Sequence, residues 1–204
     1  MKEEQDTQLS LFEEPSYTIV VGADEAGRGP LAGPVCAAAV VLPSDFPFEI
    51  LNDSKKLSEK RRNLAEPIIK EKAIAWAVAW ATHREIDRIN ILQASMLAMK
   101  RAYLKVESQL ALKGMKAEIL LVDGNRRPDV SIPCKAIVKG DATVHEIMAA
   151  SILAKNARDR LMVLCSSKWP QYGFEKHKGY PCASHKAALH KYGPCPIHRL
   201  TFRY

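Results

Sequence analysis

Four carboxylate side chains stand at or just after the ends of predicted strands of this chain, where they could act together. They belong to Asp24, Glu25, Asp123 and Asp141. Sheets of α/β proteins build their sites at strand ends, so these carboxylates would converge if the first and fourth strands are neighbours. Taken one at a time, each acid is more often a turn former or a helix cap, and Asp141 could simply cap the helix that follows it.

A cluster of four carboxylates repels itself, and at least one proton stays bound unless cations are present. Ligand sets made only of oxygen favour Mg²⁺ or Mn²⁺ over zinc. Two such ions, about 3.5–4 Å apart, would activate a water and stabilise the leaving oxygen of a phosphodiester. The four acids together therefore predict the chemistry of a metal-dependent nuclease.

Five apolar runs that would position these acids have the composition of strands. They cover residues 17–23, 34–42, 73–82, 118–122 and 135–138. In the third run Trp76 and Trp80 have the same parity, so a strand would place both on one face.

Three further regions have a helical pattern. Residues 58–71 have a helical composition, and from His83 onward apolar residues recur at spacings of three and four. A long Ala-rich helix is predicted at residues 143–164, opened by a capping box between Thr143 and Glu146.

The order of these elements predicts one mixed α/β domain. Three consecutive strands favour an antiparallel meander, and the two later strands, which follow helices, favour parallel additions to the same sheet. Helices would flank this sheet, and a segment of loops and short helices would close the chain. We expect a flexible polar tail at residues 1–16 and a single domain at residues 17–204.

The composition limits the class of protein. The chain has 204 residues, of which 47% are hydrophobic and 26% charged, as in ordinary globular proteins. Lys and Arg exceed Asp and Glu by seven, and the pI is about 9.2, which favours a polyanionic partner such as nucleic acid, although many basic proteins bind none. An odd number of cysteines without a CxxC pair, and a polar start, favour a reducing, cytoplasmic location. The longest nearly apolar run, residues 73–81, is too short to span a bilayer.

Several motifs make the expected function more specific. They are DEAGRGPLAGPV at residues 24–35, DSKKLS at 53–58, IDRINILQA at 86–94, VDGN at 122–125, KGDA at 139–142, AASILAK at 149–155, HKGYP at 177–181 and HR at 198–199. In this order, along residues 17–203, they resemble the bacterial ribonuclease HII family, the type 2 ribonucleases H. The Gly-Arg-Gly sequence and the short segment before the first strand favour type 2 over type 3, which normally carries an extra N-terminal domain.

The resemblance implies a ribonuclease H-like fold and two-metal hydrolysis, with Mg²⁺ or Mn²⁺, of the RNA strand of RNA–DNA hybrids. It also implies incision 5′ of single ribonucleotides embedded in duplex DNA, leaving 3′-hydroxyl and 5′-phosphate ends. We expect a monomer that binds no membrane. A non-catalytic protein that binds hybrids is the alternative, and the four acids argue against it, because clustered negative charge facing phosphates gives a mere binder no advantage.

Carried over position by position, the resemblance assigns roles to individual residues. Asp24, Glu25, Asp123 and Asp141 match the family's metal-binding catalytic acids. The loop formed by Gly27, Arg28 and Gly29 matches the part that senses the 2′-hydroxyl, which is the group that separates RNA from DNA. Tyr180 matches a tyrosine that packs on the junction sugar, and Lys55 and Lys56 would hold phosphates. A core or surface aromatic and a solvated charge run are the ordinary alternatives for Tyr180 and Lys56.

The N-terminal tail carries a second motif, which resembles the bacterial peptide that binds the sliding clamp. It consists of Gln8, Leu9, Ser10, Leu11 and Phe12. Such peptides place Leu and Phe side chains in an apolar pocket of the partner, while the flexible tail tethers the enzyme. The alternative is that Leu11 and Phe12 pack back on the domain.

A few positions depart from the family pattern. His145 and Glu146 stand where a small, Ser- and Ala-rich stretch is usual, Cys182 stands where Thr is common, and Leu200-Thr201 replaces Arg-Ser. His145 and Glu146 could perturb the metal site or could only cap the helix. The pairs Cys182/His185 and Cys195/His198 have a spacing that resembles a zinc site, but the loop between them is short for a zinc finger and ordinary packing is favoured.

Overall fold

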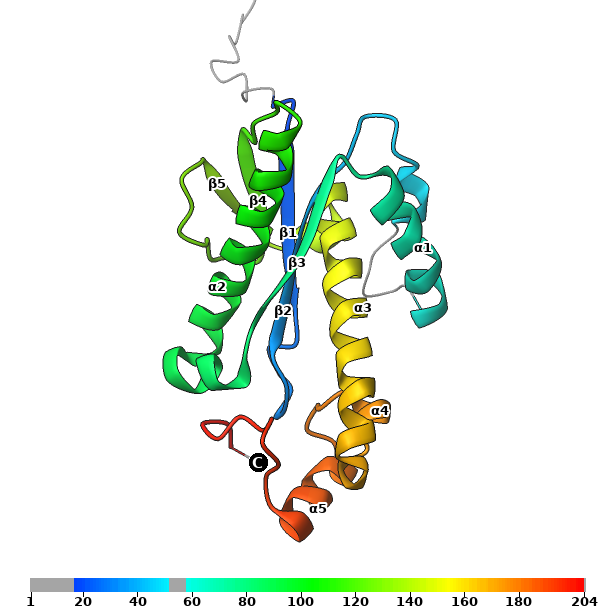
Figure 1. Ribbon diagram of the computed structural model, residues 1–204, viewed down its shortest axis with the longest axis vertical. Helices are drawn as coiled ribbons and strands as arrows, with labels where there is room; N and C mark the ends of the chain where they lie inside the picture. The colour runs from blue at the N-terminus through cyan, green and yellow to red at the C-terminus, as the bar shows by residue number, and fades with distance from the viewer. Residues whose placement is uncertain (1–16, 52–57, 204) are drawn as a thin grey trace, which may run out of the picture.

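The fold is built on one five-stranded sheet, seen in a computed structural model that describes residues 17–51 and 58–203. The strand order is β3-β2-β1-β4-β5 (Figure 1). The strands are β1 (Val20–Ala26), β2 (Val35–Val41), β3 (Ala75–Ala81), β4 (Ile119–Asp123) and β5 (Cys134–Ile137). β2 is antiparallel to β1 and β3, whereas β4 is parallel to β1 and β5, which confirms the predicted mixed sheet.

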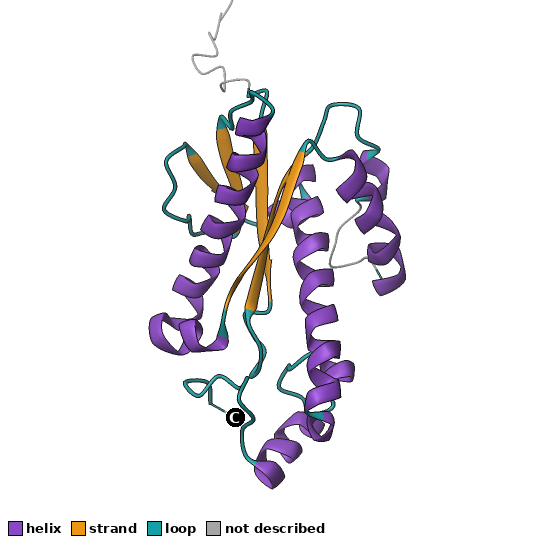
Figure 2. Ribbon diagram, viewed as in Figure 1, coloured by secondary structure: helices purple, strands orange, loops and turns teal. Residues whose placement is uncertain are grey.

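Helices cover both faces of this sheet. α2 (His83–Leu112) lies against one face, and α1 (Glu59–Lys72) and α3 (His145–Lys168) lie on the other (Figures 1 and 2). The remaining helices are short: η1 (Phe48–Ile50), η2 (Gly140–Ala142), η3 (Pro170–Tyr172), α4 (Phe174–His177) and α5 (Ala183–Tyr192). α4 and α5 lie beyond one end of the sheet, as expected for the C-terminal segment (Figure 2). No helix within residues 17–51 and 58–203 is long and apolar enough to cross a membrane.

The central strands explain why both faces must be covered. All seven residues of β2 are Val, Cys or Ala, and all are buried, as expected for a strand enclosed between two helical layers. Alternate residues of β2 join the core under α2, and the others join the core under α1 and α3. Trp76 and Trp80 of β3 both lie on the second side, which confirms their predicted parity.

Gly22 in β1 lets α3 lie very close to the sheet. A Cβ built on Gly22 would lie 2.3 Å from the backbone carbonyl carbon of Glu146, in the first turn of α3. Only a residue without a side chain allows this approach. The contact places α3 beside the strand that carries Asp24.

The start of one helix differs from the sequence prediction. The capping box predicted for Thr143 and Glu146 is wrong, because α3 begins at His145 with Val144 as its N-cap and has no side-chain cap. Thr143 instead ends the preceding 3₁₀ helix, since its N–H donates to the carbonyl of Gly140 at 3.1 Å. A capping box does open α2, between Thr82 and Glu85.

Candidate active site

Three of the four predicted acids form one cluster. Ala23 of β1 pairs with Val122 of β4, so Asp24 and Asp123 are the next residues along two neighbouring parallel strands. Asp141 lies in η2, a short distance after β5, and its N–H donates to Asp123 Oδ1 at 3.3 Å. One carboxylate oxygen from each of Asp24, Asp123 and Asp141 lies within 4.8 Å of the others.

The strands extend further than the sequence indicated. Asp24 and Glu25 are part of β1 rather than the residues after it, because pairing with β2 continues to Ala26. Asp123 is likewise the last residue of β4. Asp24, Glu25 and Asp123 are therefore held by strand hydrogen bonds rather than by loops.

Glu25 lies beside the cluster and not in it. Its carboxylate pairs with Arg28 Nη1 at 3.3 Å. It borders the same cavity as Asp24 and Asp123, which has a volume of about 420 Å³. The structure thus brings Glu25 to the site and pairs it with Arg28.

The charges at this site favour a bound cation. Burial raises the pKa of Asp24 well above its usual value, and the neighbouring Glu25 and Asp123 raise it further, while a hydrogen bond from Ser151 opposes them. Burial also raises the pKa of Glu25, against the effect of Arg28. A divalent cation would replace the proton that this crowding retains. Carboxylate oxygens are the ligands that Mg²⁺ and Mn²⁺ prefer, so these residues fit such an ion.

Three further polar residues line the cavity and were not assigned from the sequence: Arg62, Ser151 and Lys155. Asp159 holds two of them, with Lys155 Nζ at 2.7 Å and Arg62 Nη2 at 3.8 Å from its carboxylate. The signal for Ser151 and Lys155 was their spacing of four residues, which puts them on one face of a helix. Arg62 carried no signal, because only the tertiary fold brings α1 to this cavity.

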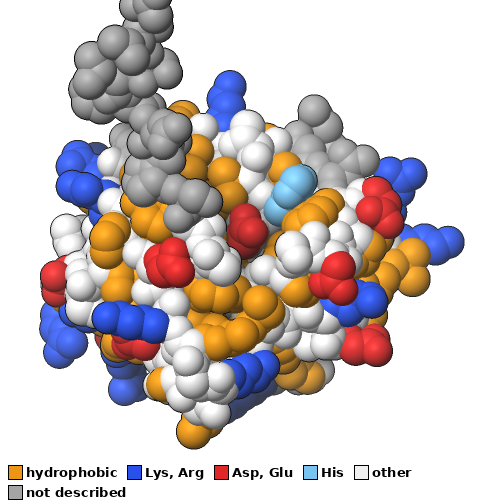
Figure 3. Space-filling view, turned by 90° about the horizontal axis from the view of Figure 1, so that it is seen from above, with side chains coloured by type: hydrophobic (Ala, Val, Ile, Leu, Met, Phe, Trp, Pro, Cys, Tyr) orange, Lys and Arg blue, Asp and Glu red, His pale blue; other side chains and the backbone are white. Residues whose placement is uncertain are grey.

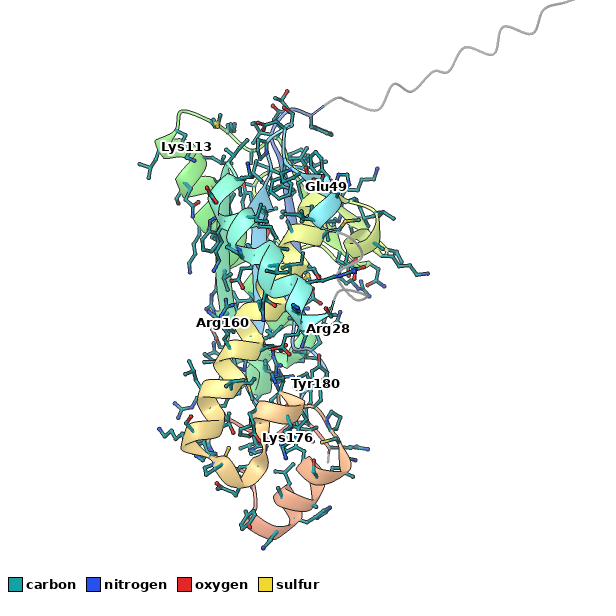
Figure 4. All side chains as sticks on the ribbon, turned by 90° about the vertical axis from the view of Figure 1, so that its right-hand side faces the viewer. Arg28, Glu49, Lys113, Arg160, Lys176 and Tyr180 are labelled. Carbon is teal, nitrogen blue, oxygen red and sulfur yellow. The ribbon has the colours of Figure 1, made fainter. Side chains whose placement is uncertain are left out.

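The Gly-Arg-Gly loop and Tyr180 meet at the mouth of the cavity. Gly27 has a φ of +98°, in the region that favours glycine. A Cβ on Gly29 would touch the Tyr180 ring at 3.6 Å. Arg28 and Tyr180 follow one another down the same side of the molecule (Figure 4). Both side chains are exposed, so a ligand could reach them.

Other predicted residues lie outside the described part of the chain. These are the phosphate-binding candidates Lys55 and Lys56, and the clamp-peptide residues Gln8, Leu9, Leu11 and Phe12.

The residues with a zinc-like spacing do not form a metal site. Within residues 17–51 and 58–203, the aspartate cluster is the one group of three potential metal ligands. His185 and His198 are buried and bond to each other. His145 is exposed and stacks on Phe48, with 4.4 Å between ring centres, so it does not join Asp141.

The excess positive charge is concentrated in the C-terminal segment. Residues 169–204 contain six Lys and Arg but only one acid. On the opposite end of the molecule, Lys and Arg lie mainly around the outline, with acidic and hydrophobic side chains between them (Figure 3). A polyanion would therefore be attracted to the C-terminal segment, which also provides Tyr180.

Known proteins with the same fold and motifs place the chain in a family. The family model described as Ribonuclease HII matches residues 21–204. Ribonuclease HII of Dechloromonas aromatica (strain RCB) is 57% identical over 184 residues, which covers 90% of each chain. That of Idiomarina loihiensis is 55% identical and covers 90% of this chain and 95% of the relative. The crystal structure of ribonuclease H2 from Pyrococcus horikoshii OT3 is similar with a TM-score of 0.68 at 26% identity, covering 91% of this chain and 94% of the other. The chain therefore belongs to the ribonuclease HII family and is a metal-dependent endoribonuclease with a ribonuclease H-like fold.

Proposed function

We propose that this chain incises duplex DNA on the 5′ side of single embedded ribonucleotides, by a two-metal mechanism that leaves 3′-hydroxyl and 5′-phosphate ends. Its coarser activity, endonucleolytic hydrolysis of RNA in RNA–DNA hybrids, accords with membership of the ribonuclease HII family. The observation that carries the proposal is that one cavity is lined by acids of the cluster, Gly27, Arg28 and Tyr180.

The metal ligands in this proposal are Asp24, Glu25, Asp123 and Asp141, and the ions are Mg²⁺ or Mn²⁺. When bound, such ions activate a water and stabilise the leaving 3′-oxygen. The hydrogen bond from Ser151 favours the ionised form of the Asp24 carboxylate, against the effects of burial and of Glu25. Lys155 and Arg62, held by Asp159, provide positive charge for phosphates beside the scissile bond.

The substrate is read through its sugar. Glycines at positions 27 and 29 allow the backbone to come close to a ribose, and a 2′-hydroxyl can both donate and accept hydrogen bonds there. Tyr180 would pack on the sugar at the junction, and Lys55 and Lys56 would hold phosphates. The basic C-terminal segment would attract the duplex through its phosphates.

The test uses a DNA duplex with one ribonucleotide, with Mg²⁺ or Mn²⁺, and an all-DNA duplex as control. We expect incision of the first duplex alone. The Asp123→Asn variant should lose cleavage with little loss of folding, because it keeps the shape of the side chain and removes its charge. If the wild-type protein makes no ribonucleotide-dependent incision, the proposal is wrong.

Tethering to a sliding clamp in the cytoplasm remains a second proposal, and it is supported by the sequence of residues 8–12 alone. We expect the full chain to bind the clamp and a Leu11→Ala/Phe12→Ala variant to bind it much more weakly. Equal binding by both proteins, or none by either, would exclude this role.

A further inference from the structure

The segment from Gly27 to Pro34, here called the glycine–arginine loop, joins β1 to β2 and is tied to the C-terminal segment. The N–H of Leu31 donates to the carbonyl of Gly179 at 2.8 Å, and the N–H of Arg199 donates to the carbonyl of Leu31 at 2.8 Å. Backbone hydrogen bonds therefore hold the loop against the segment that carries Tyr180.

The side chain of Arg199 lies beneath this loop and is fully buried. It donates hydrogen bonds to four backbone carbonyls of the loop: Gly27 at 2.6 Å, Arg28 at 2.8 Å, Gly33 at 2.9 Å and Pro34 at 3.3 Å. Lysine could not replace it, because a single ammonium lacks the planar, forked donors that reach carbonyls in several directions.

These bonds fix the direction of the loop's N–H groups as well. A peptide unit is planar, and its carbonyl and N–H point in opposite directions. The carbonyls of Gly27 and Arg28 point inward to Arg199, so the N–H groups of Arg28 and Gly29 point to the opposite side. Gly27 and Arg28 border the cavity of the candidate active site. Arg199 thus holds the loop with its donors turned away from the protein interior.

Arg158, from α3, joins the loop to the segment that carries Tyr180. It donates to the carbonyls of Ala32 at 3.1 Å and Pro34 at 3.2 Å, both in the loop, and to that of Lys178 at 3.0 Å. Its guanidinium carbon lies 5.8 Å from the centre of the Tyr180 ring. The Arg158 guanidinium therefore contacts both the glycine–arginine loop and Tyr180, which are the two groups that would lie against the sugar in the proposed function.

The absence of a side chain at Gly27 leaves room for the Arg158 side chain. A Cβ there would lie 2.0 Å from Arg158 Nε, and the positive φ of Gly27 disfavours other residues independently. A side chain at position 27 would therefore displace Arg158, the residue that supports the loop.

The two buried cations are not ordinary core residues. Within the described part of the chain neither Arg158 nor Arg199 forms an ion pair. Burial, and then the nearby Arg158, lower the pKa of Arg199 to about 9, so it stays protonated at neutral pH. Well-packed apolar residues often stabilise a core as well as buried charges do. Within the described residues, the hydrogen bonds of these two buried cations all go to backbone carbonyls, which indicates a role in shaping the loop.

We propose that Arg158 and Arg199 are positioning residues that fix the spacing between the N–H groups of the glycine–arginine loop and the Tyr180 ring, and that this spacing sets the preference for a ribose over a deoxyribose. The inference rests on the proposed function, because it takes the loop to read the 2′-hydroxyl.

The test measures how strongly binding favours a ribonucleotide duplex over an all-DNA duplex. All variants also carry Asp123→Asn, so that the substrate is not cleaved during the measurement. The dissociation constant is determined for a duplex with one ribonucleotide and for the identical all-DNA duplex. Arg199→Lys and Arg158→Lys are compared with Arg203→Lys, a matched change at an exposed arginine. Thermal unfolding of these variants checks the fold, and Mn²⁺ titration of the same variants with Asp123 restored checks the metal site.

We expect Arg199→Lys to lower the preference for the ribonucleotide duplex, measured as the dissociation constant of the all-DNA duplex divided by that of the ribonucleotide duplex. The fall should be about tenfold, roughly the loss of one well-placed hydrogen bond to the 2′-hydroxyl. Arg203→Lys should leave the ratio unchanged, and Mn²⁺ affinity should be the same in all variants. A ratio that stays within about twofold in a folded Arg199→Lys variant overturns the proposal. A background protein that does not distinguish the two duplexes instead refutes the proposed reading of the 2′-hydroxyl.

A milder variant covers the case in which neither lysine variant folds. The Thr201 hydroxyl donates to Asp87 Oδ1 at 2.8 Å, two residues after Arg199, at an exposed position. Thr201→Val removes this bond and loosens the segment that carries Arg199, while both arginine side chains are kept. We expect a smaller fall in the same ratio, and an unchanged ratio would then decide against the proposal.

Discussion

His185 and His198 meet through their Nε2 atoms at 3.0 Å, and both side chains are buried. His185 Nδ1 lies 2.9 Å from the carbonyl oxygen of Tyr180, so it carries a hydrogen. His198 Nδ1 accepts from the N–H of Cys195 at 2.9 Å, so its hydrogen is on Nε2. The pair is therefore neutral, with His198 donating to His185, and it fixes α5 to the segment that leads to Arg199.

This pair predicts a loss of stability in mild acid. Burial, and then His185, lower the pKa of His198 from 6.5 to about 4, and burial lowers the pKa of His185. As the pH falls from 6.5 towards 4, the unfolded chain takes up protons that the folded chain does not. We expect the free energy of unfolding to fall by about 1–2 kcal/mol over this range, allowing for solvent screening. Urea unfolding at several pH values measures it. His198→Gln should flatten the slope, whereas His190→Gln, at an exposed position, should not.

Ser151→Ala should weaken metal binding without weakening the fold. The hydrogen bond from Ser151 favours the ionised form of Asp24. Without it, the proton competes better with a cation, and loss of such a supporting contact typically reduces metal affinity or activity by about 10–100-fold. Alanine is a good helix former, so α3 should not suffer. Mn²⁺ titration and thermal unfolding measure the two effects, with the exposed Ser184→Ala as control. Unchanged Mn²⁺ affinity would show that Ser151 plays no part at the site.

Glu66 should stabilise the contact between α1 and α3 except in strong acid. Burial alone would raise its pKa, but hydrogen bonds from Arg160, Lys70 and Asn156 outweigh this and lower the pKa to about 2. Its contribution is complete above the unfolded value of 4.5 and is lost as the pH falls through about 2. We expect Glu66→Gln to lower the free energy of unfolding by about 1–2 kcal/mol at pH 7, after allowance for solvent screening.

The control for this change is Glu71→Gln, at an exposed position of the same helix. Denaturant unfolding at pH 7 and pH 3 compares the two variants with the wild type. The difference between wild type and Glu66→Gln should shrink at pH 3. A difference that grows in acid would contradict the sign of the pKa shift.

Gly22→Ala should destabilise the protein strongly, because its Cβ would lie 2.3 Å from the backbone of Glu146. Overpacking of this kind costs about 1–3 kcal/mol, and a clash with backbone lies at the upper end. Gly114→Ala is the control: its φ is +69°, but nothing lies within 4 Å of a Cβ there. It should cost only the conformational strain, about 1 kcal/mol. Equal losses in thermal unfolding experiments would show that α3 can move away from β1.

The sheet and the acids were predictable because each depends on local sequence. The apolar runs predicted the strands, and the acids at their ends predicted the cluster of Asp24, Asp123 and Asp141, which the structure brings together. The separate position of Glu25 was not predictable. It depends on the partner that its side chain finds, Arg28, and the loop conformation that brings Arg28 back is set by long-range bonds to Arg199.

The failed capping box has a similar cause. Thr143 and Glu146 have the right spacing, but the 3₁₀ helix before them already uses the backbone of Thr143. Arg158 and Arg199 were missed for a related reason. A single arginine in a sequence gives no sign that its donors will bind carbonyls more than a hundred residues away.

The positions of Ser151 and Arg158 on α3 limit where the chain can gain or lose a residue. The same helix contacts Asp24 through Ser151 and the glycine–arginine loop through Arg158. These two residues are seven apart, so about two turns and roughly 10 Å of helix separate the metal cluster from the loop. Inserting or deleting one residue between them would rotate one contact by about 100° relative to the other. We therefore expect this chain to tolerate an inserted residue at the turn around Gly114, where nothing lies within 4 Å of an added Cβ, but not within this stretch of α3.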